Sequence, residues 1–155
     1  MNRKCLLVMG LAILLCLLMG CSGQRGDPAE TDYLDADDFV ARAGYIELPC
    51  GYGTLKYPDR WIQSLAVECR KSGDIEINIF YYVDGDRKAE VARLSFGAAD
   101  GFLVGTVHGA DVSVRMGDIQ DAQWSESDVL NYCAMQEDIN DLIAHLPELE
   151  GFSSQ

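Results

Sequence analysis

The sequence is poor in the residues that most often carry out catalysis or bind metals. It contains only two histidines, His108 and His145, and neither has a partner that sequence spacing identifies. A nucleophile elbow, a phosphate-binding loop and the helical motif of zinc proteases are also absent. We therefore predict no catalytic residue, no metal site and no cofactor.

Basic residues are scarce as well. The chain has 12 Lys and Arg against 25 Asp and Glu, which gives a formal net charge of −13. A field of this sign repels nucleic acid and anionic lipid head groups, so a nucleic-acid partner is excluded. The acidity could attract cations, but a soluble and non-adhesive surface explains it without any ligand.

One long apolar run is present, and it lies at the N-terminus. Arg3 and Lys4 precede an apolar stretch, 6–19, which ends in Leu18-Met19-Gly20-Cys21. A cationic start, an apolar stretch and a small residue before the cut are typical of a secretory signal peptide. The four closing residues resemble the lipobox of bacterial lipoproteins, which has an aliphatic residue, a small residue before the cut and an obligatory cysteine after it.

This resemblance implies that residues 1–20 are a lipoprotein signal peptide and that Cys21 is the lipidation site. Cys21 would carry a thioether-linked diacylglycerol, with fatty acids such as palmitate, at the extracytoplasmic face of the cell membrane. Loss of Arg3 and Lys4 with the signal would change the net charge of the mature chain to −15.

Three alternatives compete for the N-terminal segment. A transmembrane helix needs roughly 20 apolar residues, and this run has about 14. A secreted protein without lipid would favour a small residue at the position that Leu18 occupies. Lipidation at Cys16 would place the large Leu15 before the cut and divide the apolar run.

The mature chain would keep three cysteines besides Cys21, because Cys5 and Cys16 leave with the signal. An odd number allows at most one intramolecular disulfide, with three choices, and export makes such a bond possible. The three cysteines are Cys50, Cys69 and Cys133. A bond between Cys50 and Cys69 across neighbouring strands is one option that remains open.

Composition divides the rest into a tether and one domain. Residues 22–38 are rich in Gly, Asp, Glu and Pro and nearly free of aliphatic side chains, which is typical of chain that cannot fold alone. We expect a flexible acidic tether over 21–42 and a single domain over 43–155. Arg25-Gly26-Asp27 matches the integrin-binding tripeptide, but so short a match in a polar linker carries little information.

Within the domain, alternating apolar residues predict short strands joined by short turns, which favours an antiparallel β-meander. The clearest strand carries Ile75, Ile77 and Ile79 on one face, which we expect to meet a C-terminal helix. The strands are expected at 45–48, 54–57, 65–69, 75–83, 92–96, 102–107 and 112–116.

The C-terminal segment changes to helical spacing. Ser125 and Asp128 are spaced as a capping box, and Pro147 ends the pattern. One sheet with one long C-terminal amphipathic helix predicts an α+β fold. We expect Asp138 to face solvent, and the following residues to face the sheet: Val129, Tyr132, Cys133, Gln136, Ile139, Leu142, Ile143 and Leu146.

Two candidate functional sites are better explained as structural features. Cys133 could be a nucleophile, but on the apolar stripe a buried thiol acts as a small hydrophobe. Asp84, Asp86 and Glu90 could suggest a calcium loop, yet they lack the alternation and the bidentate Glu of an EF-hand. An acidic hairpin is the simpler interpretation.

The most distinctive internal string is Leu55-Lys56-Tyr57-Pro58-Asp59-Arg60-Trp61. It resembles the aromatic-Pro-x-x-Trp element of Mog1/PsbP-like domains. That resemblance implies a small α/β sandwich with an antiparallel sheet that acts in binding and not in catalysis. From the residues themselves, Pro58 fixes a bend and Trp61 offers a large apolar ring to the core.

These features together predict a lipid-anchored, non-catalytic binding or assembly module whose partner is another surface protein. The alternative is a small hydrolase or metal-dependent enzyme that assembles distant residues such as Asp84, Asp86 and His108. A solute-binding lipoprotein would need two lobes and a longer chain.

Overall fold

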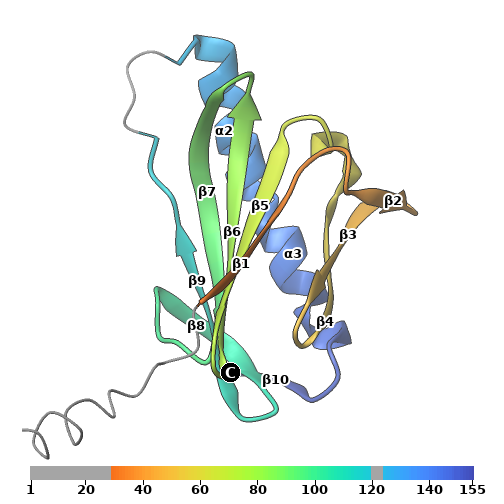
Figure 1. The fold of residues 1–155 in the computed structure, drawn as a ribbon, viewed down its shortest axis with the longest axis vertical. Coiled ribbons are helices and arrows are strands. Elements are labelled where there is room, and N and C mark those ends of the chain that lie inside the picture. Colours follow the sequence, from red (N-terminus) through yellow and green to blue (C-terminus); the bar gives the residue numbers. More distant parts are fainter. Residues whose placement is uncertain (1–28, 120–123) are drawn as a thin grey trace, which may run out of the picture.

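The computed structural model describes residues 29–119 and 124–155, which form two antiparallel sheets and a C-terminal helical segment (Figure 1). Its strands are β1 (Glu30–Leu34), β2 (Val40–Arg42), β3 (Tyr45–Cys50), β4 (Gly53–Pro58), β5 (Leu65–Ser72), β6 (Ile75–Asp84), β7 (Arg87–Phe96), β8 (Phe102–Val107), β9 (Ala110–Met116) and β10 (Phe152–Ser154). The helices are α2 (Glu126–Glu137) and α3 (Ile139–His145), with 3-10 turns η1 (Asp59–Trp61) and η2 (Leu146–Glu148).

The large sheet has seven strands in the order β1-β5-β6-β7-β9-β8-β10, and the small sheet has the order β2-β3-β4. Every pair of neighbouring strands is antiparallel. The predicted α+β class, an antiparallel meander packed against a C-terminal helix, is confirmed. The meander runs through β5, β6 and β7, and β9 then pairs with β7 while β8 lies outside it.

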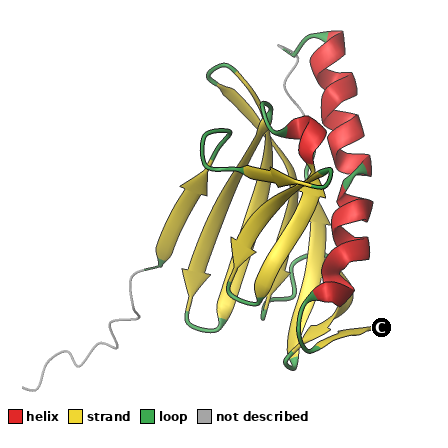
Figure 2. Cartoon of the chain, turned by 90° about the vertical axis from the view of Figure 1, so that its right-hand side faces the viewer, coloured by secondary structure: helices red, strands yellow, loops and turns green. Residues whose placement is uncertain are grey.

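The C-terminal helix begins where the sequence predicted. The Ser125 hydroxyl accepts from the Asp128 backbone N–H, and the Asp128 carboxylate accepts from the Ser125 N–H, so the capping box is complete. This arrangement satisfies two backbone donors that the first helical turn leaves free. Figure 2 shows α2 and α3 following one another along one side of the large sheet.

The core lies in one layer between the large sheet on one side and the small sheet with the helices on the other. Apolar side chains from all three parts contact one another there, so the small sheet and the helices belong to the same folding unit. Its largest fully buried members are Tyr57, Tyr132, Phe80, Phe96, Ile46, Leu48, Leu65, Leu94, Met135, Leu142 and Leu146.

The prediction for which face of β6 meets the helix is wrong. Phe80 and Tyr82 enter the core, and the Tyr82 hydroxyl donates to Asp128 of α2 at 2.9 Å. Ile77 and Ile79 point away from the helix and belong to a separate cluster on the opposite face. Both faces of this strand are apolar at its centre, so alternation identified the strand without identifying its inner side.

Two expectations for the helix are also wrong. Cys133 is exposed, and Asp138 is only 8% exposed. Tyr132, Ile139, Leu142 and Leu146 are buried as predicted, but the buried stripe continues through Met135 and Asp138 and not through Cys133. Successive helical residues are turned by about 100°, so Cys133, which follows Tyr132, lies on the solvent side, and Asp138, which precedes Ile139, lies on the buried side.

The predicted flexible tether differs from the structure in its second half. Residues 30–34 form β1, which pairs with β5, and residues 40–42 form β2. Residues 30–34 and 40–42 are therefore paired into the two sheets and are not a flexible tether. The predicted signal peptide and Cys21 lie outside the described residues. Among the residues that the structure describes, no helix is long and apolar enough to cross a membrane.

Candidate functional site

The string around Trp61 joins the small sheet to the helices. The Tyr57 hydroxyl donates to the carbonyl oxygen of Met135 at 2.6 Å, and Trp61 Nε1 donates to Asp138 Oδ2 at 2.6 Å. The guanidinium of Arg60 pairs with the same carboxylate. Burial raises the pKa of the Tyr57 hydroxyl, which therefore stays protonated as a donor. The side chains of Tyr57, Arg60 and Trp61 are thus used to join elements of the fold.

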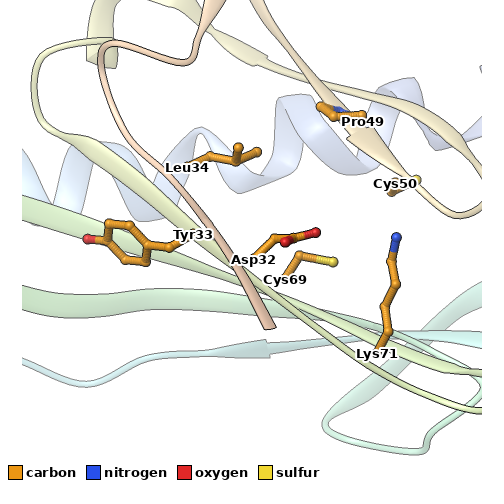
Figure 3. A pocket seen from close by; sticks show the side chains of 7 residues that line it. All are labelled: Asp32, Tyr33, Leu34, Pro49, Cys50, Cys69 and Lys71. Carbon is orange, nitrogen blue, oxygen red and sulfur yellow. The ribbon is translucent and has the colours of Figure 1, made fainter. Parts of the chain in front are cut away.

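A pocket opens where the edge of the large sheet meets the small sheet (Figure 3). It lies between β1, β3 and β5, and a second pocket beside it shares Lys71. We call the first one the inter-sheet pocket. Its walls are formed by Asp32, Tyr33, Leu34, Pro49, Cys50, Cys69 and Lys71.

Glu76 fixes the geometry of this region. Its side chain is 5% exposed, and its carboxylate accepts from Gly51 N at 2.8 Å and from Asn78 Nδ2 at 3.0 Å. Lys71 Nζ lies 3.7 Å from the same carboxylate. A buried carboxylate needs such donors and a nearby cation to offset the loss of water. Glu76 therefore binds the tip of the β3–β4 hairpin to the β5–β6 hairpin.

Tyr52 strengthens this junction. Its ring stacks on Phe96 with centroids 4.6 Å apart, and its hydroxyl donates to the carbonyl oxygen of Asp74 at 3.2 Å. The hairpin tip is thus held by a stacked ring pair and by two hydrogen bonds to the large sheet.

The two thiols of the pocket are poor nucleophiles as they stand. Burial raises the pKa of Cys50 to about 11 and that of Cys69 to about 11. A thiol with so high a pKa is almost entirely protonated at neutral pH, and the thiolate is the reactive form. This environment does not suit a catalytic cysteine.

The face of the large sheet opposite the core carries a different set of groups. Strand register places Tyr33, Glu68, Ile79, Arg93 and Arg115 in one row across β1, β5, β6, β7 and β9. The core, with α2, α3 and the small sheet, occupies the other side. We call this surface the open face: Thr31, Tyr33, Ala66, Glu68, Arg70, Ile77, Ile79, Tyr81, Val83, Lys88, Glu90, Arg93, Ser95, Ser113 and Arg115.

Charged side chains on the open face are paired with one another. Glu90 accepts two hydrogen bonds from Arg93, both at 2.7 Å, and lies 3.5 Å from Arg115. Arg115 also reaches Asp100 at 3.2 Å. Burial opposes ionisation of Glu90 and would raise its pKa, but the hydrogen bonds and positive charges of Arg93 and Arg115 outweigh this effect and lower the pKa. This half of the face is a fixed network and not a set of freely moving charges.

A second network lies on β5 and β6. Glu68 accepts from Arg70 Nε at 2.6 Å and from the Tyr81 hydroxyl at 3.1 Å. The hydrogen bond from Arg70 lowers the pKa of Glu68. Lys88 Nζ lies 4.5 Å from the ring centroid of Tyr81 and 5.3 Å from that of Tyr33, within the range of cation–π attraction.

These long side chains cover an apolar centre. Ile79 is 0% exposed and Tyr81 is 9% exposed, and with Ala66 they form a small buried cluster on the side of the sheet opposite the main core. Arginine and lysine bury their aliphatic stems against such residues while their charged ends stay in water. The open face therefore consists of paired charged side chains that cover an apolar cluster.

The residues proposed for an enzyme site do not converge. Asp84 lies at the β6–β7 turn and pairs with Arg87, whereas His108 lies in the β8–β9 turn. The ten-residue strand β7 separates these two ends of the sheet by roughly 30 Å, at about 3.3 Å per residue. In residues 29–119 and 124–155, no group of three or more His, Cys, Asp or Glu side chains could hold a metal ion.

The remaining candidates have internal partners. Glu90, considered for calcium, belongs to the arginine network of the open face. The His145 ring packs against Tyr45 with centroids 4.6 Å apart, and its Nδ1 lies 2.8 Å from the Asp141 carbonyl oxygen.

Sequence reasoning missed the open face. Its signal was the charged residues that alternate along two strands, Glu68 and Arg70 in β5 and Lys88 and Glu90 in β7. The strands expected at 65–69 and 92–96 leave out Arg70, Lys88 and Glu90, so the alternation of charges is interrupted in both.

Comparisons with protein-family models, with curated proteins and with solved structures found no significant match.

Proposed function

We propose that this protein is a lipid-anchored, extracytoplasmic binding module without catalytic activity, and that its open face contacts another surface protein. The observation that carries the proposal is the concentration of basic groups on that face. Four of the nine lysines and arginines in the described residues project from it: Arg70, Lys88, Arg93 and Arg115.

The distribution of charge supports a contact surface. The chain as a whole has a net charge of −13. On the open face, by contrast, the four basic groups are accompanied by only three acidic ones, Glu68, Glu90 and the adjacent Asp100. An acidic partner is therefore repelled less by the open face than by the net charge of the chain as a whole. Charge complementarity of this kind selects the orientation of an encounter more than it adds affinity.

Preorganisation is the second support. Arg93 is held by two hydrogen bonds to Glu90. Arginine is enriched at protein interfaces, and a side chain already fixed in place loses less conformational entropy when a partner binds.

The start of β1 limits how far the domain can lie from a membrane. If Cys21 carries the lipid, only residues 22–29 separate it from the first residue of β1. Eight extended residues span at most about 29 Å. Glu30 is in register with Lys71, beside the β5–β6 turn, so that end of the large sheet would face the bilayer.

Site-specific photo-crosslinking in intact cells tests the contact surface. A photoreactive amino acid replaces Thr31, which is exposed and in register with Arg70 on the open face. The matched control places it at Leu130, which is 65% exposed on α2. We expect one discrete adduct from position 31 and none from position 130.

A charge reversal completes the experiment. Arg115 is 44% exposed, so Arg115→Glu reverses one charge of the open face at a surface position, and the urea unfolding midpoint of the variant checks that the fold is retained. The adduct yield from position 31 is expected to fall several-fold. Equal yields from both positions, or an adduct insensitive to Arg115→Glu, would contradict the assignment of the open face.

A further inference from the structure

Two cysteines from different sheets meet in the inter-sheet pocket. Cys50 is the last residue of β3 in the small sheet, and Cys69 lies in β5 of the large sheet. Both line the same pocket and both are free thiols (Figure 3).

A single carboxylate brings these two positions together. Glu76 Oε2 accepts from the backbone nitrogen of Gly51, which directly follows Cys50, at 2.8 Å. Cys69 is in register with Asn78, whose side-chain amide donates to the same Glu76 carboxylate at 3.0 Å. The chain at Cys50 and the strand position of Cys69 are therefore tied to one fixed group.

We propose that Cys50 and Cys69 form a redox pair that becomes an intrachain disulfide after export. The proposal rests on the extracytoplasmic location proposed above, because disulfides persist in oxidising compartments and are rare in the cytosol. The bond would link the small sheet covalently to the large sheet across the inter-sheet pocket. It would close a loop of the chain that includes the whole of β4 and η1.

The oxidant is a disulfide, either of low molecular weight or from a protein. The Cys50 thiolate attacks one sulfur of it, a mixed disulfide forms and one thiol leaves. The Cys69 thiolate then attacks the Cys50 sulfur, and the second thiol leaves. The two leaving thiolates take up the two protons that the protein thiols lose, so the protein thiols are oxidised and the oxidant disulfide is reduced to two thiols with no net release of protons.

Exposure sets the order of these steps. Cys50 is partly accessible, whereas Cys69 is only 6% exposed, so Cys50 meets the oxidant and Cys69 resolves the mixed disulfide. Burial raises the pKa of both thiols. The exchange should therefore be slow at neutral pH and become faster as the pH rises.

The test uses the mature protein purified from membranes, reduced, and carrying Cys133→Ser to remove the exposed third thiol. It is equilibrated with oxidised glutathione at mildly alkaline pH, quenched with acid, alkylated and digested. We expect a protein lighter by two hydrogen atoms and a peptide pair linked through Cys50 and Cys69. The linked form should also unfold at a higher temperature than the reduced form.

Single variants provide the controls. Cys69→Ser should stop at a stable glutathione adduct on Cys50, and Cys50→Ser should react slowly or not at all. Stable glutathione adducts on both cysteines of the Cys133→Ser protein would overturn the pairing. So would thiols that stay unreacted in the folded protein but react in urea.

The same alkylation, applied to acid-quenched cells, separates this inference from the proposed location. A pair that links in the purified protein and is linked in cells supports both proposals. A pair that links when purified but is reduced in cells contradicts the extracytoplasmic location and leaves the pairing intact.

Discussion

Replacing Asp138 with alanine is expected to destabilise the domain by about 2 kcal/mol, although sequence alone predicted almost no effect. The Asp138 side chain is 11% exposed. It accepts from Trp61 Nε1 at 2.6 Å and pairs with Arg60. It lies where α2 ends and α3 begins, so it ties η1 to the junction of the two helices.

The magnitude follows from the two partners. A hydrogen bond to a charged group contributes about 1.5–3 kcal/mol, and an unpaired buried donor costs about 1–3 kcal/mol. Arg60 is 61% exposed, so solvent screens its ion pair, which adds about 0–1 kcal/mol. Alanine recovers roughly 0.5 kcal/mol through its helix propensity. The net loss is about 2 kcal/mol.

Urea unfolding of three variants measures this effect. Asp138→Ala should lower the unfolding midpoint clearly. Asp138→Asn should lie between it and the wild type, because an amide oxygen can still accept from Trp61. Glu137→Ala, which removes a neighbouring exposed charge, is the matched control. If Asp138→Ala stayed within about 0.5 kcal/mol of Glu137→Ala, the range of ordinary surface substitutions, the reasoning would be refuted.

Three further predictions concern the core, the open face and the helix surface. Ile139→Ala should cost about 2–4 kcal/mol in urea unfolding, because Ile139 is 3% exposed in the core; a loss near that of Glu137→Ala would contradict the packing. Glu68 has a pKa below its ordinary value of 4.5, so its contribution to stability is present above that pH and is lost as the pH falls through the lowered pKa. Glu68→Gln should therefore lose less stability than wild type on acidification below about pH 4.5. Equal losses would contradict the stabilisation of the Glu68 carboxylate by Arg70. Cys133 should be alkylated rapidly in the native protein while Cys50 and Cys69 react slowly, and protection of Cys133 would place the helix in a different phase.

The sequence predicted elements better than it predicted their orientation. Strands β3 to β9 and the Ser125 capping box depend on nearby residues, so local patterns were sufficient to find them, whereas β1, β2 and β10 were missed. The inner face of β6 depends on what packs against it. Ile79 and Phe80 are both completely or almost completely buried, on opposite faces of the sheet. No alternation rule could choose between them.

The error at Asp138 has a similar cause. A carboxylate beside an apolar stripe is usually solvated, and its burial here depends on Trp61 and Arg60, which are 77 and 78 positions away in the chain. For the open face the sequence carried only a partial signal, the alternating charges of β5 and β7. Its rows combine residues of five strands, and only the register of the sheet brings them together.

The inter-sheet pocket was foreseen only in part. The sequence left a Cys50–Cys69 pair open as one of three choices, and the structure places both thiols on one pocket without joining them. Glu76 could not be recognised as the organising group, because it reads as the outward residue of an alternating strand.

Intact-mass spectrometry of the protein purified from the membrane fraction tests the anchored location most directly. The account predicts a chain that begins at Cys21 and carries a diacylglycerol, with Cys21→Ser leaving the protein unprocessed or released from the membrane. A mature chain that begins at another residue, or that begins at Cys21 without lipid, would contradict it.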